Sequence, residues 1–284
     1  MDFRTPVAIT APSFSIEPLE EMLFVGSCFA DNIGQRFLDE HFRATVNPYG
    51  TMYNPVSVLH TIERWLDEMG DSLGKSSSGR LIVFITLGTN HVYRLKSTGE
   101  IVDNCQKRPQ SLFSEEELSI DECAESLRQA VGRLQDALAR MERPKSLQVI
   151  FTVSPIRYAK YGFHESQLSK ATLLLAVDKV VRETPIAHYF PAYEIVLDEL
   201  RDYRFYNADM LHPSPQAVEY IWQQLAAHYF SPATRRFLEE WRPIKTALSH
   251  RPFHPESAEY QAFLADARQR EKELLTRYSA LSAL

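Results

Sequence analysis

A serine early in the chain and an aspartate–histidine pair late in the chain have the residue types of a hydrolytic site. Ser27 follows the apolar run 22–25 and a glycine, and it precedes a helical pattern, so we expect it on an exposed turn between a strand and a helix. The N-terminus of such a helix offers unpaired backbone N–H groups, which can stabilise an oxyanion. A serine hydroxyl also needs a base before it can attack a carbonyl carbon.

The segment 209–214, Asp-Met-Leu-His-Pro-Ser, offers that base just before a predicted helix. Asp209 lies three residues before His212, so its carboxylate can orient the imidazole and fix its tautomer, and His212 could then deprotonate Ser27. Two less specific interpretations stay open: Ser27 only caps its helix, and the Asp and His belong to an ordinary surface loop. We expect Cys28 in the core, because neighbouring helix residues point about 100° apart.

The hydrophobic pattern predicts a scaffold that brings these distant turns together. Apolar runs indicate strands within 22–25, 42–46, 81–87, 147–153 and 187–193, with helical patterns between them. This alternation is typical of an α/β fold, a three-layer α/β/α sandwich around a mostly parallel sheet. The turns 26–28, 47–50, 88–90 and 154–157 all follow strands. Because ligands bind outside the carboxyl ends of parallel strands, we expect these turns to converge on one site.

The fold prediction has two additions. Residues 92–95 and 100–103 read as an inserted β-hairpin, since a Lys-Ser-Thr-Gly turn separates two short strand patterns. Residues 231–284 are polar, charged and helical with Pro breaks, so we expect a C-terminal helical extension after a domain that spans residues 1–230.

Composition argues against several other classes of protein. Hydrophobic residues make up 44% of the 284 residues, enough for a core, and no apolar run approaches the roughly 20 residues that span a bilayer. The net charge of −6 disfavours nucleic-acid binding, and a phosphate loop rich in Gly is missing, which disfavours a nucleotide-binding flavodoxin-like protein. The histidines share no metal-ligand spacing. We therefore expect no cofactor, no metal and no membrane partner, and leave open a homo-oligomer.

The cysteines and the start of the chain indicate a compartment. Cys28, Cys105 and Cys123 are odd in number and form no C-x-x-C, which disfavours a disulfide framework. The first residues lack a basic region followed by an apolar one, so a secretory signal is not expected. Both observations predict a cytoplasmic protein.

A set of short motifs resembles one protein family. Residues 26–30 spell Gly-Ser-Cys-Phe-Ala, the signature that gives the GSCFA family its name. Further matches follow in the family's order over roughly residues 20–230: Asn47-Pro48-Tyr49-Gly50, Tyr53-Asn54-Pro55, Thr86-Leu87-Gly88-Thr89, Asn104-Cys105, Thr152 to Arg157, Ser169-Lys170-Ala171, Tyr189 to Glu194 and Asp209 to Ser214. That family resembles the SGNH, or GDSL-like, hydrolases, which have a flavodoxin-like fold and include serine esterases, lipases and carbohydrate O-acetyl esterases or acyltransferases.

The resemblance implies roles for particular residues. Ser27 matches the SGNH nucleophile, and Asp209 and His212 match the late D-x-x-H block, with His212 as the base. Gly50 matches the block that supplies a backbone N–H group to the oxyanion hole. Asn90 falls where the superfamily has the asparagine that donates to the oxyanion from its side chain.

Some positions leave alternatives. Asn104 competes with Asn90 as the oxyanion donor, and the Asn104 side chain, Arg157 and Tyr49 are candidates for binding substrate. The family commonly reads Asn-Cys-His-Lys where this chain has Gln106 in place of the histidine. The expected function is a serine-dependent ester hydrolase or O-acyltransferase that acts, through an acyl-enzyme, on a small acyl ester such as one of a carbohydrate. The alternative is a catalytically inactive SGNH-fold protein that binds a ligand or glycan.

Overall fold

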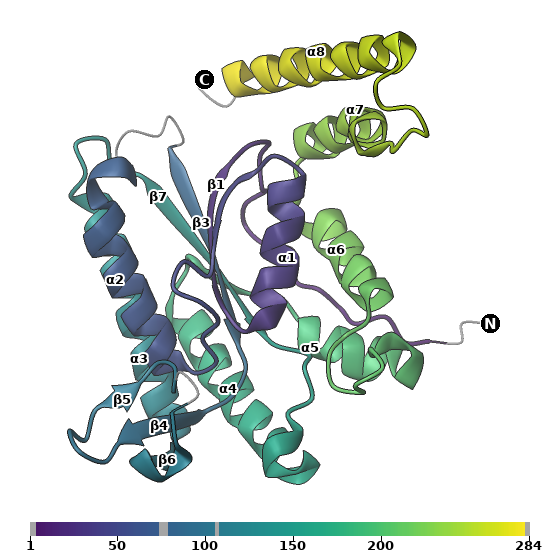
Figure 1. Ribbon diagram of the computed structural model, residues 1–284. Helices are drawn as coiled ribbons and strands as arrows, with labels where there is room; N and C mark the ends of the chain where they lie inside the picture. Colours follow the sequence, from purple (N-terminus) through teal and green to yellow (C-terminus); the bar gives the residue numbers. More distant parts are fainter. Residues whose placement is uncertain (1–3, 74–78, 106–107, 282–284) are drawn as a thin grey trace.

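A parallel β-sheet lies at the centre of the computed structural model, which describes residues 4–73, 79–105 and 108–281 (Figure 1). Its strand order is β2-β1-β3-β7-β8, and each neighbouring pair is parallel. The strands span Glu21–Gly26 (β1), Arg43–Val46 (β2), Arg80–Leu87 (β3), Ser146–Val153 (β7) and Ala187–Tyr189 (β8). This is the flavodoxin-like order, in which β1 pairs on both sides and the strand order reverses beside it. The turn after β1 therefore lies at the switch point where such sheets bind ligands.

Alternating side chains of the strands build two cores, one on each face of the sheet. Leu23 and Val25 of β1 face α2, α3 and α4, whereas Met22 and Phe24 face α1 and α6. The period of two sends successive side chains to opposite faces, and nearly every strand residue is apolar because both faces are covered. The helices span Cys28–Asp39 (α1), Pro55–Leu73 (α2), Ile120–Ala139 (α3), Phe163–Glu183 (α4), Ala192–Glu194 (α5) and Pro215–Tyr229 (α6). The predicted α/β/α sandwich is confirmed.

The predicted hairpin is present and has a third strand. In the small antiparallel sheet, β4 (His91–Leu95) pairs with β5 (Ile101–Val102) and with β6 (Phe113–Glu117). The sequence of β6, Phe-Ser-Glu-Glu-Glu, was not expected as a strand because it has no apolar alternation. An ion pair supports its pairing with β4: Arg94 lies 3.1 Å from Glu116, which is two residues along β6 from Ser114, the register partner of Arg94. This sheet follows β3 and lies at the carboxyl end of the parallel strands.

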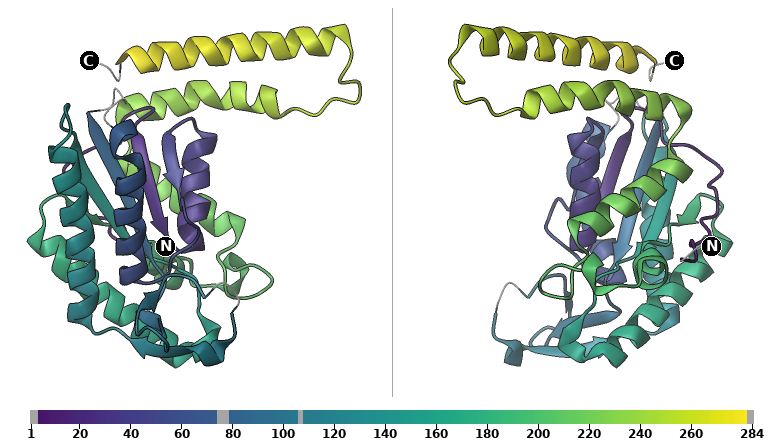
Figure 2. Two further views of the ribbon diagram at one scale, coloured as in Figure 1. Left: turned by 60° about the vertical axis from the view of Figure 1, so that its left-hand side comes forward. Right: turned by 90° about the vertical axis from the view of Figure 1, so that its right-hand side faces the viewer.

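The C-terminal helices α7 (Pro232–Ser249) and α8 (Ala258–Leu281) lie at the opposite end of the central sheet from the small sheet (Figure 2). Trp241 of α7 donates from its indole N–H to the carbonyl oxygen of Asp39, at 3.3 Å, where α1 ends. Lys245 pairs with Glu40 at 2.9 Å, and Phe237 packs with Tyr278 of α8. The extension therefore buttresses the amino-terminal end of the sheet and leaves the carboxyl end uncovered. No helix among the described residues is both long and apolar enough to cross a membrane.

Candidate active site

Ser27 lies where β1 ends and α1 begins, as predicted, but it is 1% exposed, so the expectation of an exposed turn was wrong. Its Oγ accepts a hydrogen bond from the Phe29 N–H at 3.3 Å, so Ser27 does cap the helix, and its own N–H donates to the Thr86 carbonyl oxygen at 3.0 Å. The preceding Gly26 has a φ of 145°, and a Cβ atom there would lie 2.1 Å from the Thr86 oxygen. Only glycine allows this approach of β1 to β3. Backbone packing thus fixes the hydroxyl at the N-terminus of α1.

The second component is a loop that holds His212 against Asp209. Asp209 Oδ2 lies 2.6 Å from His212 Nδ1, and Oδ1 accepts from the backbone N–H groups of Leu211 at 2.9 Å and His212 at 3.0 Å. The backbone N–H of His212 is the main reason why the pKa of Asp209 falls to about 2, with the Leu211 N–H and the imidazole adding to it. A carboxylate at Nδ1 favours the tautomer with its proton there. The Nε2 atom is then left to accept a proton.

Arg157 anchors this loop from the turn that follows β7. Its backbone N–H donates to the Leu211 carbonyl oxygen at 3.0 Å, and its guanidinium donates to the Met210 carbonyl oxygen at 2.9 Å. The ring of Phe163 lies 4.2 Å from the guanidinium carbon. Met210 has a φ of 57°, a left-handed conformation that costs energy in a residue with a side chain. Arg157 therefore holds a strained backbone in place directly beside His212.

Ser27 and His212 line one cavity, which we name the Ser27 cavity. Its volume is about 300 Å³. The turns after β1, β3 and β7 and the late loop contribute to its wall. Three of the four turns predicted to converge therefore meet here, whereas the turn 47–50 supplies no lining residue. The lining residues are Ser27, Cys28, Tyr53, Gly88, Ser154, Ile156, Arg157, Tyr158, Ala159, Lys160, Lys170, Leu211 and His212.

The donors that the resemblance implies for an oxyanion hole are bonded elsewhere in this structure. The Gly50 N–H donates to the Asn47 carbonyl oxygen at 2.9 Å. The Asn90 amide donates to the Leu118 carbonyl oxygen at 2.8 Å, and Asn90 is 2% exposed. Neither residue is among the residues that line the Ser27 cavity. Asn90 instead ties the start of β4 to the end of β6, and the Ser27 N–H is bonded to β3.

Three other candidates differ in position. Arg157 lines the Ser27 cavity, whereas Asn104 and Tyr49 are not among its lining residues. Asn104 is exposed, just beyond β5. The hydroxyl of Tyr49 donates to Glu68 at 2.7 Å, and Arg64 stacks on its ring at 3.8 Å, so Tyr49 packs against α2. Gln106 lies outside the described residues.

Cys28 is half-buried and lines the Ser27 cavity, so the expectation of a core residue was only partly right. Its position at the first residue of α1 places it beside the opening as well as against the core. Burial raises the pKa of the Cys28 thiol. A raised pKa keeps the sulfur protonated, which makes it a poor nucleophile.

Lys170 of α4 belongs to the Ser169-Lys170-Ala171 match with the family, but sequence reasoning assigned it no role in the site. It is 2% exposed, and its Nζ donates to the carbonyl oxygens of Gly88 at 2.6 Å and Ser154 at 2.9 Å. The sequence feature that could have identified it is a lysine within a helix face whose other residues are small or apolar. This face comprises Ser166, Ser169, Lys170, Leu173, Ala176, Val177 and Val180. A cation at such a position needs buried acceptors, and only the tertiary structure supplies them.

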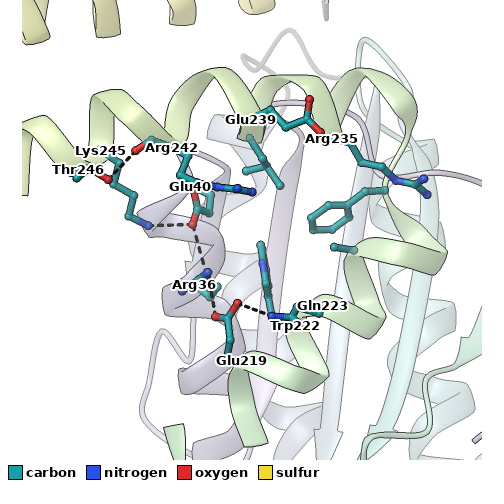
Figure 3. A pocket seen from close by; sticks show the side chains of 13 residues that line it. Arg36, Glu40, Glu219, Trp222, Gln223, Arg235, Glu239, Arg242, Lys245 and Thr246 are labelled. Carbon is teal, nitrogen blue, oxygen red and sulfur yellow. Dashed lines mark hydrogen bonds and ion pairs between the residues drawn. The ribbon is translucent and has the colours of Figure 1, made fainter. Parts of the chain in front are cut away.

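A larger cavity of about 670 Å³ lies under α7, between α1 and α6 (Figure 3). Its polar wall is an ion-pair chain in which Lys245 binds Glu40 at 2.9 Å, and Arg36 lies 3.4 Å from Glu40 and 3.1 Å from Glu219. These ion pairs join α1 and α6 to α7, as expected of a structural contact with the C-terminal extension. Within the described part of the chain, no group of three or more His, Cys, Asp or Glu side chains is arranged to hold a metal ion.

Comparison with known families and structures gives two kinds of match. The GSCFA family model matches residues 21–78 and 67–225, and the model described as the GSCFA domain protein, C-terminal domain, matches residues 241–283. No curated protein matches the chain.

The solved structures that match are distant. One is a structure from Streptococcus pneumonia that is described as a platelet activating factor. It is 14% identical to this chain with a TM-score of 0.45, and the match covers 75% of this chain and 84% of that protein. An acetyl esterase mutant with an acetate ion is 12% identical with a TM-score of 0.41, covering 73% and 95%. TesA is 13% identical with a TM-score of 0.40, covering 73% and 99%.

Proposed function

This chain belongs to the GSCFA family, and we propose that it is a serine-dependent ester hydrolase or O-acyltransferase acting on a small acyl ester. One observation carries the proposal: Ser27 from the first strand-to-helix turn and His212 from a late loop line the same cavity. The Nδ1 atom of His212 is already bonded to Asp209, so the imidazole is oriented by a carboxylate. Nucleophile, base and orienting acid are the three components of serine acyl transfer.

In the first step the Ser27 hydroxyl attacks the ester carbonyl carbon. The Oγ–C bond forms, the carbonyl electron pair moves to its oxygen, and the serine proton goes to His212 Nε2. The capping hydrogen bond from the Phe29 N–H uses a lone pair of Oγ, so the hydroxyl proton remains free to transfer. Asp209 stabilises the imidazolium that results, and its low pKa keeps it ionised throughout the neutral range.

In the second step the tetrahedral intermediate collapses. The leaving alcohol takes the proton from His212, and the acyl group stays on Ser27 as an ester. A water molecule, or an acceptor hydroxyl in the case of a transferase, then gives its proton to His212 and attacks the acyl carbon. The second tetrahedral intermediate collapses when its Oγ–C bond breaks: Ser27 Oγ takes the proton back from His212, and the acid or the new ester leaves.

The size and lining of the Ser27 cavity favour a short acyl group. Its volume of about 300 Å³ lies at the small end of ligand pockets. Ile156 and Leu211 are apolar lining residues that suit an alkyl chain, whereas the rings of Tyr53 and Tyr158 suit the face of a sugar leaving group. An acetylated carbohydrate is the ester that we propose to test first.

The test compares wild type with Ser27→Ala on p-nitrophenyl acetate and on an acetylated oligosaccharide. We expect the variant to lose turnover. Ser119→Ala is the matched control, because Ser119 also caps a helix through a 3.3 Å hydrogen bond and lies outside the Ser27 cavity. Equal turnover by wild type and Ser27→Ala would end the proposal.

The bonding of Gly50 and Asn90 away from the Ser27 cavity favours a second candidate, an SGNH-fold protein that binds a glycan without catalysis. A fluorophosphonate probe distinguishes the two functions, because it reacts only with an activated serine. Adduct formation on Ser27 supports the hydrolase. A missing adduct together with tight binding of an unacylated oligosaccharide supports the binding protein.

A further inference from the structure

The wall of the Ser27 cavity contains a buried cation that the mechanism above does not use. The Lys170 ammonium bonds to two backbone carbonyls, Gly88 O just after β3 and Ser154 O just after β7. It has no carboxylate within ion-pair distance among the described residues. An ammonium carries three N–H donors, so these two bonds leave one donor for the cavity that Lys170 lines.

A purely structural role explains this arrangement poorly. Burying a charged group without a counter-charge is expensive, and two carbonyl acceptors repay only part of the lost hydration. Burial also lowers the pKa of Lys170 to about 7, because an ammonium is less well solvated there than in water. Joining two strand ends needs no such residue, because β3 and β7 are already paired along their whole length.

Several other donors in the wall of the Ser27 cavity are bonded elsewhere or screened by water. The Ser27 N–H is bonded to Thr86, and the Arg157 guanidinium is bonded to Met210. Lys160 is 42% exposed at its side chain and lies 3.6 Å from a carboxylate oxygen of Glu115, so water and that carboxylate screen its charge. Lys170 shares the wall with Ser27 and is shielded from water.

We propose that Lys170 is a catalytic residue that binds the oxyanion of the tetrahedral intermediate through its third N–H, an inference that rests on the proposed function. The carbonyl oxygen gains the electron pair when the Ser27 Oγ–C bond forms, and the ammonium holds that negative charge without giving up its proton. The charge returns to the carbonyl when the leaving alcohol departs with the proton from His212. A buried cation serves this step well because its interaction with a developing anion is strongest where water is excluded.

A lysine could instead act as the base, since a neutral amine would also donate twice and direct its lone pair to the cavity. The pH profile separates these roles. An oxyanion donor must be charged, so wild type loses kcat/KM at alkaline pH and Lys170→Gln does not show that loss, whereas a lysine base must be neutral and gives no such loss in wild type. The titratable groups that face Lys170 from neighbouring elements are Cys28 of α1 and Tyr193 of α5, and Lys160 and His212 share its cavity.

The experiment uses Lys170→Met and Lys170→Gln in the full chain, with Lys179→Met as the control. Lys179 is on the same helix, is 43% exposed at its side chain and pairs with Asp121. We expect kcat on p-nitrophenyl acetate to fall about 10²- to 10³-fold in the Lys170 variants, and the affinity for n-propylboronic acid, which forms a tetrahedral adduct on serine, to fall in parallel. KM should change little, and Lys179→Met should match wild type.

A second measurement covers the case in which the Lys170 variants do not fold. In a crystal structure of the wild-type boronate adduct on Ser27, we expect a boronate oxygen within about 3 Å of Lys170 Nζ. An oxygen bound by Gly50 or Asn90 instead, folded Lys170 variants with wild-type kcat, or an alkaline side of the kcat/KM profile that is the same in wild type and in folded Lys170→Gln would each overturn the inference. If Ser27→Ala is inactive in those cases, the proposed function stands; if Ser27→Ala is as active as wild type, both fall.

Discussion

Asp209 Oδ2 lies 2.6 Å from His212 Nδ1 within one loop that also bonds the other carboxylate oxygen to two backbone N–H groups. One carboxylate oxygen therefore orients the imidazole, and the other accepts hydrogen bonds from the backbone. A substitution that keeps the backbone hydrogen bonds and removes the negative charge beside the imidazole can separate these two roles. Five predictions concern this loop and the arginine that anchors it, the turn before Ser27 and the C-terminal extension.

Asp209→Asn should lower kcat by about 10³- to 10⁴-fold, because an amide retains the acceptor for the backbone but cannot stabilise the imidazolium or hold its tautomer. Steady-state kinetics on p-nitrophenyl acetate measure the effect. Asp198→Asn is the control, since Asp198 is 64% exposed at its side chain and lies 3.8 Å from Arg201. A kcat of Asp209→Asn that is less than tenfold below wild type would show that Asp209 is not part of the proposed triad.

The stability difference between wild type and Asp209→Asn should depend on pH. The folded pKa of Asp209 is about 2, below its ordinary 3.8, so the ionised carboxylate stabilises the folded state above the unfolded pKa. That contribution is lost as pH falls from about 4 to about 2, where the carboxyl group becomes protonated. Thermal unfolding of both proteins between pH 6 and pH 2 should show their Tm values converging at the acid end. A constant difference would contradict the assigned hydrogen bonds.

Arg157→Met should lower kcat roughly 10- to 100-fold with a smaller change in KM, because Arg157 holds the Met210 carbonyl beside His212. A residue that bound substrate would instead raise KM. Arg201→Met, which alters a solvent-exposed arginine, is the matched control. A rise in KM at constant kcat would return Arg157 to the substrate-binding role that the sequence suggested.

Gly26→Ala should destabilise the protein by about 3 kcal/mol or more, because the new methyl group would lie 2.1 Å from the Thr86 carbonyl oxygen. The comparison is Gly132→Ala in α3, where nothing lies within 4 Å and the change should stabilise the helix by about 0.5–1 kcal/mol. Chemical denaturation measures both. Equal stability of the two variants would show that the turn relaxes.

Trp241→Ala should destabilise the folded chain by about 3–5 kcal/mol, since Trp241 is 4% exposed and packs in the core between the extension and the sheet. Its kcat should stay at the wild-type value while the chain remains folded, because α7 lies at the opposite end of the sheet from the Ser27 cavity. Leu248→Ala, a partly buried neighbour of that core, should lose less stability. A parallel loss of kcat would connect the extension to the site.

The sequence alone determined the architecture and the principal chemical groups. An apolar run as short as 81–87 indicates a strand that is covered on both faces. Parallel strands place the turns that follow them at one edge of the sheet. The sequence therefore predicts that Ser27 and His212 share a cavity. The signal is local in each case: a period in hydrophobicity, a cap, or a short spacing within one loop. Strand β6 could not be predicted from its own residues, because its pairing depends on β4, which comes from another part of the chain.

Tertiary structure alone decided which donors face Ser27 and where the extension lies. Asn90 and Gly50 were placed correctly after strands, yet the direction of an N–H bond depends on acceptors contributed by other segments, here Leu118 and Asn47. Lys170 showed the reverse: a lysine in a helix pattern has no visible partner until α4 is packed against the ends of β3 and β7. Hydrogen bonds are satisfied by neighbours in space, and those neighbours come from residues far apart in the chain.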